Sequence, residues 1–481
     1  MPHSDNILDR TILQISKTDA VRFRDIIEGG LFVSGGLGSG KSSTVLFQTA
    51  MSCLMAGFGF LVLTVKSDET QHWIEYAKKT GREKDLLVFN ANSGLSFDPL
   101  AYLWQSGGRA AAHIETIVEA FTILMGVGKN SQHSSEAQYF ERAVEELLRA
   151  ALVVLSNAGE PISILSLRRL IASLPHEEGA SDTPEWQNSS ECARILEGLK
   201  SRFETLPESN KDDLDVAIVH LLTKWSGLDY RTRSNIESTW SGMASRFVYS
   251  PFRELFCSGR FDWTPEQITH EHKILIVDMP ALEYGRHTSR ICQVLIKLIC
   301  QRAWLRHQYK PGCCNGAVLF QDEFAFLMHR DEQHFHTVCR GSAIAPICAC
   351  QNILTIAAEE FGENMPGSRT LGFLGLFGVK VFMANNEMTT NEFSANQIGR
   401  EWRYVEGWNA GENQHNAHMG VSGSKQLVHL IDPIAFTNLL KPDGQNPFAE
   451  GIVYVSGRNF NATKTASRPQ GLPYLRVHFS R

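Results

Sequence analysis

Residues 35–42 carry the clearest chemical pattern in the chain, Gly-Gly-Leu-Gly-Ser-Gly-Lys-Ser. Glycines at these spacings let backbone N–H groups close around a triphosphate, and the apolar run 30–33 supplies the strand that such a loop follows. We expect Lys41 to reach the β and γ oxygens, Ser42 to give a hydroxyl to Mg²⁺, and the next helix to point its positive end at the phosphates. The pattern predicts binding of ATP and Mg²⁺. The predicted nucleotide contacts are Gly35, Gly36, Gly38, Ser39, Gly40, Lys41, Ser42 and Ser43.

A second chemical signal follows a later apolar run. Residues 317–320 are apolar, and the carboxylates Asp322 and Glu323 come just after them. We expect Asp322 to hold Mg²⁺ through water, and Glu323 to orient and deprotonate the attacking water as a general base. An acidic pair after an apolar run is common by itself. Because a phosphate loop needs such a pair, the two signals together predict ATP hydrolysis.

Three further polar residues lie in or beside apolar runs. Gln351 ends the run 345–351, so it is a candidate for sensing the γ-phosphate or the attacking water; the alternative is a glutamine that only satisfies a strand end. Arg340 is a candidate arginine finger for a neighbouring subunit's nucleotide, and the alternatives are a surface ion pair or a substrate contact. Asp278 is either a group behind the site or a buried residue with a backbone partner, and the sequence leaves both open.

Composition is that of an ordinary globular protein. The 481 residues are 43% hydrophobic and 20% charged, which suits two to three domains with a large core. A net charge of −6 means that contacts to a polyanion must be gathered locally, in a pore or groove. The ten cysteines are scattered without a C-x-x-C pair, as in a cytosolic protein with reduced thiols. A metal site at Cys313 and Cys314 is the alternative, although the spacing matches no zinc pattern.

Short apolar runs alternating with helical patterns predict an α/β fold with a mostly parallel sheet. We expect helices at 69–79 and 289–307. The run 51–65 is better explained as a helix end and a buried strand than as a membrane span, since it carries polar residues and glycines. The expected strands are 30–33, 58–65, 86–89, 273–279, 317–321, 345–351, 378–384 and 451–456, the last of these being the final strand.

Between the early and late strands the pattern becomes helical. Apolar residues recur at helical spacing in 140–155, 163–174, 192–203, 214–225 and 235–247, as expected of a bundle core. We therefore predict an all-helical domain inserted at 107–260 into a nucleotide-binding domain formed by 1–106 and 261–481. Residues 408–424, rich in Gly, Asn and Ser, are predicted to be a mobile loop.

These features resemble the type IV secretion coupling proteins of bacterial conjugation, the TraG/TraD group within the FtsK/HerA class of P-loop ATPases. Individual motifs are weakly specific beyond the loop and the carboxylates, and their order along one chain carries the resemblance. The matching segments are Lys66-Ser67-Asp68-Glu69, Phe89-Asn90, Phe97-Asp98-Pro99-Leu100, the helix 231–247 with Phe261-Asp262 and the strand after it, Asp322-Glu323-Phe324, Ala349-Cys350-Gln351-Asn352 and the stretch 378–402.

The resemblance implies a RecA-like P-loop domain in a hexameric ring that moves DNA through its centre. It assigns Walker A roles to Lys41 and Ser42 and Walker B roles to Asp322 and Glu323, with Gln351 beside them and Arg340 as the finger. Family members usually begin with transmembrane helices, whereas this sequence starts about thirty residues before the loop with none. We therefore expect action in the cytoplasm, or at the inner membrane through partners. Residues 66–69 lack the family's usual Asp and Gly.

Three functions are weighed. The first is an ATP-driven ring translocase of DNA that grips the phosphate backbone with little base readout. The second is a secretion-system adaptor ATPase whose helical domain recruits a protein substrate, a relaxase or an effector, to channel components. A small-molecule kinase is the third; it fits less well, because no Arg-rich lid is visible and the acidic pair suits activation of water.

Overall fold

The computed structural model describes residues 6–106, 110–127, 135–310, 316–413, 416–443 and 445–480. Within these ranges the chain is α/β, with nine strands in a mostly parallel sheet and helices flanking it, as predicted. The chain divides into two compact units. Unit 1 consists of Met1–Ala56, Ala345–Ala358 and Glu363–Arg481, and unit 2 of Gly57–Ile344 and Glu359–Gly362.

Unit 1 holds the strands in the order β13-β12-β9-β3-β8. Strand β3 pairs in parallel with β8 and β9, and β12 pairs antiparallel with β9 and β13. The expected last strand is therefore not the last. Strand β13 alternates buried and exposed residues at its end, so it lacks the continuous apolar run by which the other strands were predicted. The bounds are β3 Leu31–Ser34, β8 Ile344–Cys350, β9 Val379–Met383, β12 Phe448–Val455 and β13 Tyr474–Ser480.

Short elements surround these strands in unit 1. A small hairpin opens the chain, and the helix after β3 begins with a π-helical turn. A core formed around Phe382 and Phe436 packs α20 and α21 against the sheet. The bounds are η1 Ile7–Asp9, β1 Thr11–Gln14, β2 Ala20–Arg22, α1 Phe23–Ile26, η2 Ser42–Leu46, α2 Phe47–Met55, α18 Ile353–Ile356, η7 Ala357–Phe361, α19 Ser368–Gly375, α20 Met388–Ile398, α21 Ile434–Thr437 and η8 Asn461–Thr463.

Unit 2 holds four parallel strands in the order β7-β4-β6-β5. Trp73 of α3 packs on the sheet, with its ring centroid 5.3 Å from that of Phe60 and 4.8 Å from that of Phe320. The expected strands and both expected helices are confirmed here to within a few residues. The bounds are β4 Gly59–Thr64, α3 Glu69–Lys79, η3 Glu83–Asp85, β5 Leu86–Phe89, β6 Ile274–Asp278, α14 Ala281–Tyr284, α15 Arg286–Leu305, β7 Ala317–Gln321, α16 Phe324–Leu327, α17 Glu332–Val338 and η6 Cys339–Ser342.

In the predicted helical stretch, every regular element among the described residues is a helix. Val144, Leu147, Leu148 and Leu155, members of one predicted stripe, have no exposed surface, so the stripe is bundle core. The bounds are α4 Pro99–Gln105, α5 Ala110–Gly126, α6 Ser135–Ala158, α7 Ile164–Ala172, η4 Ala180–Asp182, α8 Pro184–Ser189, α9 Glu191–Phe203, α10 Glu208–Ile218, η5 Val219–Lys224, α11 Tyr230–Val248, α12 Phe252–Phe256 and α13 Pro265–His270.

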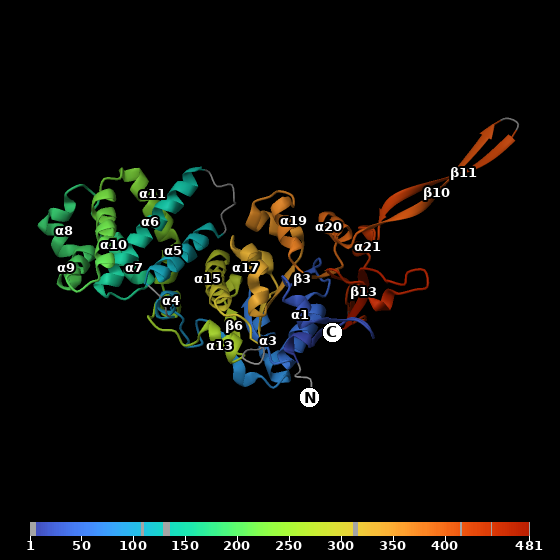
Figure 1. Ribbon diagram of the computed structural model, residues 1–481, viewed down its shortest axis with the longest axis horizontal. Coiled ribbons are helices and arrows are strands. Elements are labelled where there is room, and N and C mark those ends of the chain that lie inside the picture. Colours follow the sequence, from blue (N-terminus) through green and yellow to red (C-terminus); the bar gives the residue numbers. More distant parts are fainter. Residues whose placement is uncertain are drawn as a thin grey trace. The chain divides into compact units, whose positions relative to one another are not determined.

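The predicted mobile loop at 408–424 is wrong. Strands β10 Arg400–Asn413 and β11 Asn416–His429 pair over their whole length as an antiparallel ribbon, separate from the large sheet. Figure 1 shows this ribbon projecting beyond the helices of unit 1. Its Gly, Asn and Ser content resembles that of a loop, but ladder hydrogen bonds satisfy the backbone of any residue except proline, so composition alone does not exclude a strand.

Two sequence-based expectations concern cysteines and membrane spans. The eight cysteines in the described ranges are free thiols, and all except Cys257 are buried, in agreement with the prediction of reduced core residues. Cys313 and Cys314 lie outside the described residues. Among the helices that the structure describes, none combines the length and apolar character needed to cross a bilayer.

Candidate functional site

The glycine loop follows β3, whose four residues are all buried. Gly38 and Gly40 adopt φ angles of +69° and +87°, a region that favours glycine. A Cβ on Gly40 would lie 2.9 Å from Pro442 Cγ, and one on Gly35 would lie 2.7 Å from Ser39 Oγ. The loop therefore forms a tight cradle of backbone that side chains would fill.

The cradle has the donors that a phosphate group needs. Lys41 Nζ donates to the carbonyl oxygens of Gly35 at 2.5 Å and Gly36 at 3.3 Å, so the ammonium lies across the loop. The hydroxyl of Ser39 is buried and has no hydrogen-bond partner among the described residues. An orphaned buried hydroxyl beside an ammonium in a glycine cradle fits an anionic group with several acceptor oxygens.

Ser42 and Ser43 open the helix after the loop. The Thr44 N–H donates to Gly40 O at 3.0 Å, so helical bonding begins within the loop and Ser42 is the first residue of the π-helical turn. The Ser43 hydroxyl points back to Gly40 O at 3.5 Å. The predicted strand, loop and helix order is confirmed.

The carboxyl end of β8 lies beside the loop. The Gly35 N–H donates to Cys350 O at 3.3 Å, which places Gln351, the next residue, next to the glycine cradle. Asn385 Nδ2 donates to Gln351 O at 2.9 Å, and the Gly36 N–H donates to Ala384 O at 2.8 Å. Unit 1 thus brings together the loop, Gln351 and Asn385, a buried amide that the sequence analysis did not select.

The two carboxylates follow the buried strand β7 in unit 2. Asp322 is 8% exposed, and Lys66, just beyond β4, faces both acids. Lys66 Nζ lies 2.9 Å from Glu323 Oε1, 3.6 Å from Asp322 Oδ2 and 3.4 Å from Glu69 Oε1. Lys66 and Glu69 were noticed only as part of a segment that departs from the family pattern, and their chemistry is visible only in the structure.

The charges in this cluster shift two pKa values. Burial raises the pKa of Glu69 to about 7, helped by repulsion from Asp322 and opposed by Lys66. Burial acts to lower the pKa of Lys66, but attraction to Asp322, Glu69 and Glu323 outweighs it and raises the pKa overall. Lys66 therefore stays charged and supplies a fixed cation beside the acidic pair.

Asp278 at the end of β6 has side-chain partners, in place of the backbone partner weighed above. Thr70 Oγ1 donates to its Oδ1 at 2.7 Å and Asn90 Nδ2 donates to its Oδ2 at 2.8 Å. Because Thr70 is next to Glu69, Asp278 anchors the start of α3 and thereby the position of Glu69.

Arg340 is not brought to the carboxylates of its own unit. It lies in the turn η6 before β8, and the Ala317 N–H donates to Ala343 O at 3.2 Å. Residue 343 is thus beside the start of β7, whereas Asp322 follows its end. A strand of this length, five residues, spans roughly 17 Å. Arg340 and the acidic pair lie at opposite ends of β7.

A buried network of polar and charged side chains contacts Gln321, the residue before Asp322. The sequence analysis did not predict this network. Lys297 of α15 has no exposed side-chain surface, and its Nζ lies 2.5 Å from Glu332 Oε2 and 3.0 Å from Gln321 Oε1. Gln301 Nε2 donates to Glu332 Oε1 at 3.1 Å. Since Gln321 immediately precedes Asp322, this network fixes the end of β7 and the turn after it.

Replacing Lys297 with methionine is expected to lower the free energy of unfolding by about 3–5 kcal/mol, because Glu332 keeps a buried charge without its cation. Urea unfolding measures the change. A second variant, Lys297→Met with Glu332→Leu, removes both charges and should recover most of the loss. A single-variant loss below about 1 kcal/mol would show that the pair is not buried as described.

His329 makes stability depend on pH. Its Nδ1 accepts the Asp331 N–H, and its Nε2 lies 3.0 Å from Gln301 Oε1, an arrangement that suits a neutral ring. Burial lowers its pKa, although Glu332 opposes this. Below the ordinary pKa of about 6.5 the unfolded chain binds a proton that the folded one refuses, so stability falls by up to about 1.4 kcal/mol per pH unit. Unfolding free energies between pH 7 and 5 should decline less steeply in His329→Gln than in the wild type.

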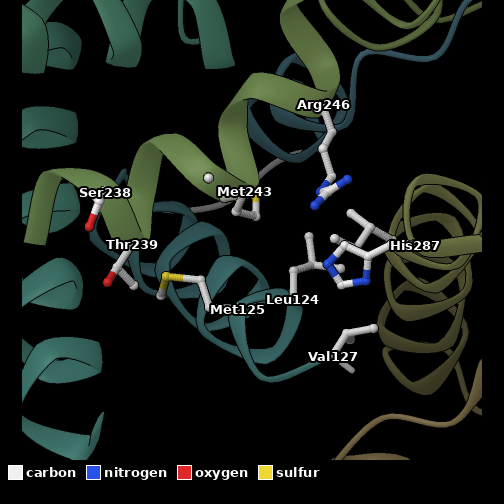
Figure 2. Close-up of a pocket in the computed structure, with 10 residues that line it drawn as sticks. Leu124, Met125, Val127, Ser238, Thr239, Met243, Arg246 and His287 are labelled. Carbon is white, nitrogen blue, oxygen red and sulfur yellow. The ribbon is translucent and has the colours of Figure 1, made fainter. Parts of the chain in front are cut away.

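A separate hollow of about 430 Å³ opens among α5, α11 and α15 in unit 2 (Figure 2). Met125 and Met243 form part of its apolar wall, and Arg246 points toward His287 in Figure 2. Arg246 donates to Thr288 Oγ1 at 3.2 Å, but its Nε is buried without a partner among the described residues. Burial and the nearby Arg246 and Arg290 lower the pKa of His287. The lining belongs to the helical part of the unit and includes no residue of the predicted nucleotide site.

Comparisons with known proteins bear on the fold. No protein-family model matches the sequence, and no curated protein matches it. A structure of the bacterial conjugative coupling protein TrwB in an unbound form aligns with a TM-score of 0.56 at 16% identity, covering 98% of this chain and 90% of TrwB.

Two further TrwB structures contain nucleotides. The complex with the non-hydrolysable GTP analogue GDPNP aligns with a TM-score of 0.56 at 16% identity, over 98% of this chain and 91% of TrwB. The complex with ADP and Mg²⁺ gives 0.57 at 15% identity, over 98% and 90%. The chain therefore has the fold of the conjugative coupling protein TrwB, as the resemblance to coupling proteins predicted.

Proposed function

We propose that this protein is a P-loop ATPase that moves DNA through a ring of its own copies, with ATP hydrolysed at subunit interfaces. One observation carries the proposal: a complete glycine cradle with Lys41 across it and Gln351 beside it, in a chain that also ends a buried strand in Asp322 and Glu323. The TrwB complexes with GDPNP and with ADP and Mg²⁺ support a nucleotide and Mg²⁺ as the ligands.

In this proposal the residues divide the chemistry by type. Lys41 and the loop N–H groups bind the β and γ oxygens, and Ser42 and Asp322 would hold Mg²⁺. The metal would supply neutralisation of charge on the phosphates. Glu323 orients and deprotonates the attacking water, and Gln351 contacts the water or the γ-phosphate. Arg340 serves the nucleotide of the next subunit.

Lys66 is a positioning residue in this proposal. Its ammonium holds Glu323 at 2.9 Å and balances the charge of the acidic pair. With Glu69 fixed through the start of α3, Lys66 limits the directions in which Glu323 can point.

Lys66→Met is expected to lower kcat by roughly ten- to a hundredfold with KM for ATP unchanged, since the base loses its orientation while the phosphate loop is intact. Lys66→Arg should retain most of the activity, because it keeps the cation. Lys78→Met, on the exposed side of α3, is the matched control. A raised KM with an unaltered kcat would show that Lys66 contributes to nucleotide binding and does not position Glu323.

Hydrolysis rates with no polymer, single-stranded DNA and duplex DNA test the proposal, with ATP and GTP compared and the oligomer mass recorded. Stimulation by either DNA, lost in Lys41→Ala, supports a DNA translocase. Absence of hydrolysis under every condition contradicts it. Affinity for DNA should fall as salt rises, because backbone contacts release counterions.

We propose that 107–260 is an inserted helical domain within a nucleotide-binding domain of 1–106 and 261–481. DNA, other copies in a hexamer, and relaxase or channel components are the proposed partners, and the proposed location is the cytoplasm, or the inner membrane through those partners.

The second candidate is a secretion adaptor ATPase, and the hollow of Figure 2 favours it. Its methionines suit an apolar anchor of a protein cargo, and the unpaired Nε of Arg246 suits a neighbouring acceptor. Hydrolysis stimulated by a relaxase or effector but not by DNA would favour this function.

A further inference from the structure

The β10–β11 ribbon has an exposed apolar face near its root. Trp402 and Tyr404 are 62% and 71% exposed, and Leu427 is 47% exposed. Trp402 is paired directly with Leu427, so both side chains lie on one face. A Cβ on Gly423 would collide with the ring of Tyr404, which places that ring over Gly423 on the same face.

Along the rest of the ribbon the alternating phase of Trp402 and Tyr404 is mixed. The register pairs Trp408 with Val421 and Ala410 with Met419, but Glu406 and Glu412 have the same phase, and Lys425 is paired with Tyr404. The other phase begins with Glu401 and Arg403. The exposed apolar patch among the described side chains is therefore the one that Trp402, Tyr404 and Leu427 form at the root of the ribbon.

Glu401, on the opposite face of the ribbon from Trp402, already has hydrogen-bond partners within unit 1. Glu401 accepts from Arg403 at 2.5 Å and from Arg468 at 2.8 Å. Arg400, in the same phase as Trp402, donates to Asn396 Oδ1 of α20 at 3.0 Å. These contacts hold the root of the ribbon to its unit, while Trp402 and Tyr404 stay largely exposed.

Such a ribbon needs a partner. A two-stranded sheet is at best marginally stable in water, because half of its side chains and both of its edges are exposed. Aromatic residues on an exposed, ordered surface are typical anchors of protein interfaces.

The net charge of the ribbon indicates which class of partner it can bind. Residues 400–429 contain three basic side chains, Arg400, Arg403 and Lys425, and three acidic ones, Glu401, Glu406 and Glu412. A neutral ribbon offers no attraction to the polyanionic backbone of DNA or to an anionic lipid surface. A protein surface of mixed polarity fits it better. Arg340 indicates which protein, because it lies at the far end of β7 from its own acidic pair and serves the proposed reaction only from another copy.

We propose that the Trp402–Tyr404 face of the ribbon docks on a neighbouring copy of this chain and holds the ring together. The proposal rests on the proposed function for its choice of partner. A contact between a ribbon and a different surface of the next copy is heterologous, and contacts of that kind form a ring when the rotation between copies closes.

Sedimentation velocity of the full chain, with and without a non-hydrolysable ATP analogue, Mg²⁺ and DNA, tests this proposal. The variant with both Trp402→Ser and Tyr404→Ser should associate roughly ten- to a hundredfold more weakly than the wild type. The matched control, Val405→Ser with Gln426→Ser, changes exposed residues of the opposite phase and should assemble normally. Binding of a fluorescent ATP analogue, unchanged in both variants, shows that unit 1 is folded.

A second measurement identifies the partner directly. Tyr404→p-benzoylphenylalanine, irradiated in the assembled state, should give a product of twice the chain mass. Unchanged assembly of the Trp402→Ser/Tyr404→Ser variant overturns the proposal, as does loss of DNA or vesicle binding with assembly intact. A wild type that binds nucleotide but stays monomeric overturns it and leaves the ATPase standing. A wild type that assembles but does not hydrolyse ATP overturns the proposed function alone.

Discussion

Replacing Arg340 with alanine is expected to lower kcat for ATP by about 10³- to 10⁵-fold, the effect of removing an arginine finger. The physical reason is that its guanidinium stabilises charge on the transferring phosphoryl group of another subunit. Its place at the start of β8, at the opposite end of β7 from Asp322, is consistent with action in trans. ATP binding and the melting temperature should be almost unchanged.

Mixing subunits of two inactive variants tests whether Arg340 acts as an arginine finger in a neighbouring subunit or has only a structural role. Neither Arg340→Ala nor Lys41→Ala alone should hydrolyse ATP, but a mixture should recover activity, because some interfaces combine an intact loop with an intact arginine. Arg330→Ala, which removes a partly exposed arginine of the same unit, is the control and should be active. If the mixture stays inactive while both variants assemble, Arg340 does not act across an interface.

The variant Glu323→Gln should bind ATP with near-normal affinity and hydrolyse it about 10²- to 10⁴-fold more slowly. The amide keeps the shape of the side chain but cannot take a proton from water. A filter-binding assay measures affinity, and phosphate release measures turnover.

The control for Glu323→Gln is Glu75→Gln, an exposed carboxylate on α3. It should behave like the wild type, because Glu75 is on the solvent side of that helix. Normal turnover in Glu323→Gln would remove Glu323 as the base and leave Glu69, whose pKa burial raises to about 7, as the next carboxylate to test.

Parts of the fold that depend on local pattern were predictable. Strands β4, β6 and β7 are buried on both faces, so each appears in the sequence as a short continuous apolar run. The glycine loop was equally clear, since positive φ angles at Gly38 and Gly40 require that residue type. Strand β13 was missed because an edge strand with one exposed face carries no such run.

The tertiary structure alone decided which distant residues meet. Lys297 and Glu332 are 35 positions apart, and nothing local marks a lysine in an apolar helix as the partner of a buried carboxylate. The same holds for Lys66 and the acidic pair, which come together because β4 and β7 are parallel neighbours with carboxyl ends at one edge. The ribbon β10–β11 depends on pairing between two strands that have weak signals separately. The sequence by itself therefore determined the chemistry of the glycine loop and of the acidic pair, because backbone geometry and burial constrain residue type locally. Only tertiary packing determined which charged side chains surround the acidic pair and which face of the β10–β11 ribbon stays exposed.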